Sequence, residues 1–247
     1  MNPFLNMEKH KEEFTQNDMR IYQAILEQPE RVISLSTSRF AEEINVSQPA
    51  LTRFIKVLGY QRYNDFRSDI TAFSATLNQM SQSDSLPYFD RLRILLSETE
   101  KVLSDQYLNE LADYILSASR IFTTGMGKSL QPAHLLQSLL RKYGIFVNAV
   151  PLDELIETAD SLTTDELLII FSVSANKDLM QRITNSDARI MLVTTNAGHP
   201  YANKIDKTVL LPYLPPDPET SSVSPVLFDI LVELIDSYIA PKIMEKK

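Results

Sequence analysis

The sequence predicts two parts of different fold class: an all-helical N-terminal part and a following α/β part with a five-stranded parallel sheet. Helical periodicity runs through the first part. Ser, Gln, Asn and Pro then interrupt the apolar pattern, and beyond residue 118 short β-rich runs alternate with helical patterns, as is typical of a parallel sheet. We therefore expect domains at residues 1–78 and 88–247, joined by a linker at 79–87.

Composition narrows the class of protein. The 247 residues are 44% hydrophobic and carry a formal net charge of -8. Because the chain has no cysteine, disulfides and thiolate metal sites are excluded, and the three histidines stand far apart in sequence. The longest apolar run, LLIIF at 167–171, is far shorter than the roughly 20 residues of a membrane span, and the N-terminus lacks the apolar stretch of a signal peptide. We expect a cytoplasmic protein without a metal or other cofactor.

Residues 36–59 follow the pattern of two short helices joined by a tight turn. STSRFAEEI predicts the first helix and SQPALTRFIKVLG the second. Ser47 is a suitable N-cap, and Pro49 fits the first helical turn, where its missing N–H costs nothing. Val46 and Leu51 are placed as a hydrophobic staple that sets the angle of the second helix. This arrangement predicts a helix-turn-helix (HTH) motif.

The second helix separates its apolar and polar residues onto opposite sides at about 100° per residue. Residues 44–67 hold four basic residues and one acidic residue, although the whole chain is acidic. A helix that enters the major groove of DNA needs such a basic outward face, since Arg reads guanine and Lys suits phosphate. The alternative is the solvated face of an ordinary amphipathic helix. The residues expected to contact double-stranded operator DNA are Ser47, Gln48, Thr52, Arg53, Lys56, Arg62 and Arg67.

Residues 20–67 resemble the N-terminal domain of the RpiR/MurR transcriptional regulators. The family string S-x-x-x-[L/V]-x-R-F-x-x-x-L-G-[Y/F]-x-x-[Y/F]-x-[D/E]-F is matched from Ser47 to Phe66. The matching residues are Ser47, Leu51, Arg53, Phe54, Leu58, Gly59, Tyr60, Tyr63, Asp65 and Phe66. The resemblance implies a DNA-binding domain that controls genes of sugar or amino-sugar metabolism.

A glycine-containing turn is expected where the first strand of the α/β part meets a helix, in TTGMGKSLQPAHLL at 123–136. A Walker A loop would need Gly where Phe122 stands, and a dinucleotide fingerprint would need Gly where Leu130 stands. The remaining interpretation is a phosphate-ester site made of backbone N–H groups at a helix start and the Ser129 hydroxyl. The expected strands lie at 120–125, 145–150, 167–173, 189–195 and 207–212.

A second polar loop, FSVSANKD at 171–178, follows the third expected strand. If the first and third strands are neighbours, both loops open at the same carboxyl edge of the sheet, where ligands bind in open α/β folds. The hydroxyls of Ser172 and Ser174 together with Lys177 suit a phosphorylated polyol. The alternative for any one of these serines is an ordinary structural role, as a helix N-cap or as a turn residue that hydrogen-bonds to the backbone.

Residues 107–212 resemble a sugar isomerase (SIS) domain, which has a flavodoxin-like sheet. Its phosphosugar site combines a G-x-G-x-S loop, an S-x-S-G-x-T loop and a strand end, matched near VTTNAGHPYANKID. Ala175 stands in place of the motif glycine and Lys177 in place of the threonine. The resemblance implies a phosphorylated sugar as effector. Because one copy of the DNA-reading helix would bind weakly, we also expect a homodimer or homotetramer that reads two half-sites. By position, the phosphosugar-binding residues would be Gly125, Gly127, Ser129, Ser172, Ser174 and Lys177.

Our main hypothesis is a transcriptional regulator, expected to be a repressor, whose SIS domain binds a sugar phosphate and changes the spacing of the DNA-reading helices. We do not expect an enzyme, because the candidate general bases Glu219, His199, Glu154 and Glu157 stand in no catalytic motif. Two alternatives remain: a sugar-phosphate isomerase, and a DNA-bound scaffold whose ligand pocket is degenerate.

Overall fold

The computed structural model describes residues 3–81, 87–175, 180, 183, 186–196, 199, 201–212 and 224–245. Its contacts divide the chain into two compact units. The N-terminal unit comprises Met1–Arg91 with Ala197–Pro200, and the C-terminal unit comprises Leu92–Asn196 with Tyr201–Lys247. The division falls inside a helix, α7 (Tyr88–Val102).

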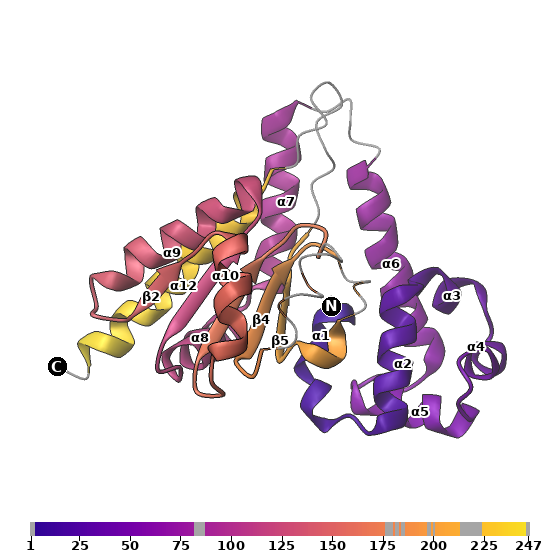
Figure 1. Ribbon diagram of the computed structural model, residues 1–247. Helices are drawn as coiled ribbons and strands as arrows, with labels where there is room; N and C mark the ends of the chain where they lie inside the picture. The colour runs from indigo at the N-terminus through magenta and orange to yellow at the C-terminus, as the bar shows by residue number, and fades with distance from the viewer. Residues whose placement is uncertain are drawn as a thin grey trace. The chain divides into compact units, whose positions relative to one another are not determined.

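The N-terminal unit is helical, as expected (Figure 1). Its core is aliphatic and aromatic: Ile21, Phe40, Leu51, Phe54 and Phe66 are fully buried. Helical spacing places these apolar residues on inward faces, and their burial fixes how the short helices pack. The elements are α1 (Pro3–Lys9), η1 (Lys11–Glu13), α2 (Gln16–Glu27), α3 (Pro29–Ser34), α4 (Thr37–Glu43), α5 (Gln48–Val57) and α6 (Tyr63–Ser81).

The turn between α4 and α5 is closed by backbone hydrogen bonds around Asn45. Its φ of 54° lies in the left-handed region, which asparagine accepts more readily than most residues. The Asn45 N–H donates to the Glu42 carbonyl at 3.1 Å and the Val46 N–H to the Ala41 carbonyl at 3.0 Å, which ends α4 in a Schellman arrangement. Ser47 then caps α5 by accepting a hydrogen bond from the Ala50 N–H at 3.2 Å, which confirms the predicted N-cap.

The C-terminal unit contains a five-stranded sheet in which every pair of neighbouring strands is parallel. The strand order is β2-β1-β3-β4-β5, the doubly wound order of flavodoxin-like folds. All five predicted strands are confirmed, with slightly narrower bounds. They are β1 (Ile121–Gly125), β2 (Val147–Ala149), β3 (Leu167–Phe171), β4 (Arg189–Thr194) and β5 (Lys207–Leu210).

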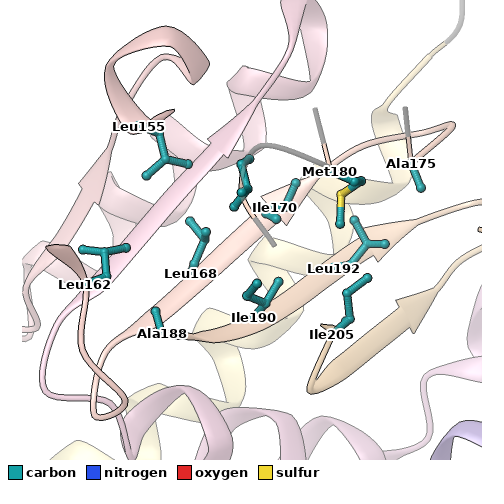
Figure 2. Close-up of a cluster of buried hydrophobic side chains, with 11 residues drawn as sticks. Leu155, Leu162, Leu168, Ile170, Ala175, Met180, Ala188, Ile190, Leu192 and Ile205 are labelled. Carbon is teal, nitrogen blue, oxygen red and sulfur yellow. The ribbon is translucent and has the colours of Figure 1, made fainter. Parts of the chain in front are cut away.

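Helices cover both faces of the sheet, so all five residues of the central strand β3 are buried. On one face, Phe171 meets Phe228 of α12 with ring centroids 5.8 Å apart. On the other, Figure 2 shows Leu168 of β3 near Ile190 of β4, with Leu155 from the covering helix. After α7, the described helices and short turns of this unit are α8 (Asp105–Leu116), η3 (Gly127–Leu130), α9 (Gln131–Arg141), α10 (Leu152–Thr158), η4 (Ala159–Ser161), η5 (Ala202–Lys204) and α12 (Val226–Met244).

Candidate DNA-binding and ligand-binding sites

The helix α5 has one buried and one exposed side, as the sequence predicts. Leu51, Phe54 and Ile55 point into the core. Arg53 is 58% exposed and Lys56 is also exposed, so both side chains are accessible on the surface of the N-terminal unit. The other predicted residues of the helix and its cap are exposed too, namely Ser47, Gln48 and Thr52.

Three side chains from other helices hold α5, and sequence reasoning did not find them. Asn6 of α1 donates a buried hydrogen bond of 2.8 Å to the Leu58 carbonyl at the C-cap of α5. The Ser38 hydroxyl of α4 donates to Gln48 Oε1 at 3.0 Å. Arg53 Nη2 lies 3.7 Å from Asp18 Oδ1 of α2. Each contact joins residues that are ten or more positions apart, so no local pattern in the sequence could reveal it.

Arg62 and Arg67 lie outside α5, around the beginning of α6. The Arg62 backbone N–H donates to Asp65 Oδ2 at 3.0 Å, which caps α6, while the Arg62 side chain is exposed. Arg67 is half-buried, and its carbonyl accepts a hydrogen bond of 2.8 Å from the Thr71 hydroxyl. The structure therefore places Arg53 and Lys56 on the same helix, Arg62 just before α6 and Arg67 on α6.

In the C-terminal unit, the first glycine-containing loop folds tightly against the end of β1. A Cβ atom on Gly125 would lie 2.1 Å from the Ser129 carbonyl oxygen, a distance that no side chain tolerates. Gly127 has a φ of 59°, in the left-handed region that favours glycine. The turn η3 leads directly into α9, so the loop presents the N-terminal backbone of η3 and α9, the kind of site that binds anions. Ser129 itself is buried.

The second loop begins beside the first, because β1 and β3 are neighbours and Gly125 pairs with Phe171 in register. Ser172 is buried and Ser174 is exposed. Ala175 is buried with a φ of 48°, so alanine adopts the left-handed conformation at the position where the SIS motif has glycine. Such a conformation costs an L-residue roughly 1–2 kcal/mol, and the surrounding structure maintains it.

The end of β4 braces this second loop. The Thr194 and Thr195 hydroxyls donate to the Val173 carbonyl at 3.1 and 3.0 Å, and Asn196 Nδ2 donates to the Ser174 carbonyl at 2.8 Å. The sequence analysis did not predict these three side chains as site residues, although it assigned the strand end that carries them to the SIS motif. The polar residues after β4 thus fix the backbone that carries the serines.

The remaining candidate residues are Lys177, which was predicted to bind phosphosugar, and the four possible general bases. Lys177 and Glu219 are outside the described residues. Burial lowers the pKa of His199 to about 4, and Glu154 and Glu157 are exposed on α10, as expected of a solvated face.

Two further findings concern the described ranges as a whole. Within them, no set of three or more His, Cys, Asp or Glu side chains is grouped as a metal site would require. None of the helices described is both long and apolar enough to cross a bilayer.

Comparison with known proteins agrees with this architecture. Residues 1–82 match the protein family described as "Helix-turn-helix domain, rpiR family". An uncharacterized HTH-type transcriptional regulator of Providencia stuartii is 24% identical over 234 residues, which cover 87% of this chain and 82% of that protein. The HTH-type transcriptional regulator HexR of Escherichia coli is 21% identical over 227 residues, covering 85% and 78% of the two chains.

Solved structures show the same fold at low sequence identity. The Vibrio vulnificus NanR protein, complexed with ManNAc-6P, matches with a TM-score of 0.53 and 17% identity over 99% of this chain and 95% of that one. The sugar isomerase domain of an RpiR transcription factor from Sphaerobacter thermophilus gives a TM-score of 0.51 and 21% identity, covering 68% and 90% of the two chains.

In this chain an HTH motif is followed by a doubly wound parallel sheet, a fold that is also found in the sugar isomerase domain of the Sphaerobacter thermophilus RpiR transcription factor. The N-terminal part of this chain is an rpiR-family HTH domain. The relatives that align with most of this chain are named as HTH-type transcriptional regulators.

Proposed function

We propose that this protein is a transcriptional repressor that binds operator DNA through α5 and responds to a phosphorylated sugar at the loops after β1 and β3. The observation that carries the DNA part is the division of α5 into a buried apolar side and an exposed side with Arg53 and Lys56. A helix of this kind fits the major groove, with its N-terminal residues at the base edges. In this proposal the exposed side contacts DNA together with Arg62 and Arg67.

The protein acts as a homodimer or homotetramer in this proposal. One short recognition helix makes few contacts, and two copies that read two half-sites about 34–36 Å apart supply the affinity that one lacks. Since its target is DNA, we expect the protein in the cytoplasm. The regulated genes are expected to belong to sugar or amino-sugar metabolism, as the family resemblance implies.

Backbone geometry supports the phosphosugar part of the proposal. The loop after β1 requires glycine at 125 and favours it at 127, and it ends at the start of α9. Ala175 keeps a left-handed conformation despite the replaced glycine, which supports a pocket that has kept its shape. NanR was solved with ManNAc-6P, and we propose a related sugar phosphate as effector, bound at Gly125, Gly127, Ser129, Ser172, Ser174 and Lys177.

The effector controls DNA binding only if it binds more tightly to one arrangement of the DNA-reading helices than to the other. A coupling free energy of about 1–3 kcal/mol corresponds to a change of roughly 5- to 150-fold in operator affinity. For a repressor the sugar phosphate weakens operator binding.

Salt dependence of DNA affinity tests the first part. Lys56→Ala is expected to weaken binding to all duplexes and to make the slope of log affinity against log salt shallower by about 0.9 for each phosphate that is no longer neutralised. Lys101→Ala, which removes an exposed cation from α7, serves as the matched control and is expected to leave the slope unchanged. Equal slopes for wild type and Lys56→Ala would contradict the assignment of α5.

Ligand binding is tested by thermal unfolding with a panel of hexose, hexosamine and pentose phosphates, with and without operator DNA. A bound effector at ~100 times its dissociation constant stabilises the protein by ~2.7 kcal/mol. No response to any sugar phosphate would favour the scaffold alternative. Aldose–ketose interconversion by the purified protein would instead identify an isomerase.

A further inference from the structure

Asp18 is a buried carboxylate with a fixed orientation beside an exposed arginine. Its side chain is 5% exposed, and Oδ2 accepts hydrogen bonds from the Thr15 backbone N–H at 3.0 Å and from the Thr15 hydroxyl at 2.6 Å. The bond from the Thr15 N–H, together with a 3.3 Å bond from the Asp18 N–H to the Thr15 hydroxyl oxygen, forms the capping box at the beginning of α2. The carboxylate is therefore held in place by its own helix, independently of Arg53.

The second carboxylate oxygen of Asp18 is directed to the recognition helix. Oδ1 lies 3.7 Å from Arg53 Nη2, and among the residues that the structure describes none donates a hydrogen bond to it. A buried charged oxygen without a partner is unfavourable, so the Arg53 guanidinium is attracted to this position. The segment that leads into α2 also packs against α5, because Phe14, just before α2, contacts Phe54 with ring centroids 5.1 Å apart.

Arg53 keeps most of its hydrogen-bonding capacity in this arrangement. Its side chain is 58% exposed, and a guanidinium has five N–H donors in a planar fork. One amino group turned to Asp18 leaves other donors accessible. An arginine that reads guanine must hold this fork in one plane, and ordering a free, flexible side chain costs conformational entropy. An anchored arginine has lost part of that freedom before DNA arrives.

We infer that Asp18 is a positioning residue that orients the Arg53 guanidinium for bidentate recognition of a guanine. This inference rests on the proposed binding of DNA by α5. It differs from a purely structural role, in which the ion pair only fastens α2 to α5. A structural role would affect stability and overall affinity, but it would leave the preference for a particular base pair unchanged.

Base preferences measured with a randomised duplex library test the inference and do not require a known operator sequence. The full-length protein and its variants are each incubated with the library, and the bound duplexes are sequenced. Asp18→Asn keeps an oxygen acceptor for Thr15 but removes the charge. Arg53→Lys changes an exposed side chain and keeps its charge without the planar fork. Ser36→Ala, the control, removes the N-cap of α4 in the same unit and touches neither member of the pair.

The wild type is expected to prefer a G·C pair at one position of each half-site by roughly 5-fold or more. Asp18→Asn and Arg53→Lys are expected to lose this preference and to keep those at other positions, whereas Ser36→Ala keeps all of them. If either Asp18→Asn or Arg53→Lys kept the preference, the inference would be overturned. The proposed binding of DNA by α5 would not be affected by that result. If the wild type enriched no sequence at all, the proposed function itself would fail.

Discussion

The Asn196 side-chain amide donates a 2.8 Å hydrogen bond to the backbone carbonyl of Ser174. This bond connects the end of β4 to the loop after β3, so the two serines of that loop depend on a residue from the neighbouring strand. The effector site proposed above is therefore assembled from three adjacent parallel strands, β1, β3 and β4.

Asn196→Ala is expected to weaken sugar-phosphate binding, because the loop loses one of its three braces. The stability change should stay within about 1 kcal/mol, since the bond is exposed. Ligand-induced stabilisation across the sugar-phosphate panel measures the effect. Asn109→Ala, which removes an exposed side-chain bond to the Asp105 carbonyl on α8, is the control and should respond like wild type. Identical ligand affinities for Asn196→Ala and wild type would show that the brace is unimportant.

Gly125→Ala is expected to destabilise the C-terminal unit by more than about 2 kcal/mol, because the new methyl group would overlap the Ser129 backbone. Gly144→Ala provides the comparison: its φ of 78° also disfavours alanine, but nothing lies within 4 Å of its added Cβ, so a cost near 1 kcal/mol is expected. Chemical denaturation of both variants measures the two losses. Equal losses of stability in the two variants would mean that the backbone of the loop after β1 can shift to accommodate the methyl group.

Ala175→Gly is expected to cost about 1–2 kcal/mol less than Ala133→Gly. Both alanines are buried, so both lose a packed methyl group. Only Ala175 has a positive φ, and glycine relieves the strain there, whereas glycine in the helix α9 adds a helix-propensity cost. Free energies of unfolding test this difference, and a larger loss at position 175 than at 133 would refute it.

Asn6→Ala is expected to lower the stability of the N-terminal unit by about 1–3 kcal/mol, because the Leu58 carbonyl would be left buried without its donor. DNA affinity should fall as well, since the end of α5 would be less firmly held. Thr71→Ala loses an exposed side-chain bond to a backbone carbonyl in the same unit and should change stability little. Denaturant titration of the two variants compares the loss of a buried hydrogen bond with the loss of an exposed one.

The sequence by itself determined the local elements. Alternation of β-rich and helical runs predicted all five strands and their parallel arrangement. The capping pattern around Ser47 predicted the turn, and helical periodicity predicted the exposed side of α5. These features follow from the spacing of neighbouring residues, which the sequence displays directly. The residues proposed to bind DNA and phosphosugar remain predictions, and Lys177 lies outside the described residues.

Tertiary structure decided which distant residues meet. Asp18 reaches Arg53, Asn6 reaches Leu58, and the end of β4 braces the loop after β3 only because buried apolar faces bring their elements together. A long-range contact depends on the packing of whole helices and strands, and no spacing between neighbouring residues encodes it. The sequence therefore predicts which chemical groups the two proposed sites contain, while the fold determines which of those groups are held in place.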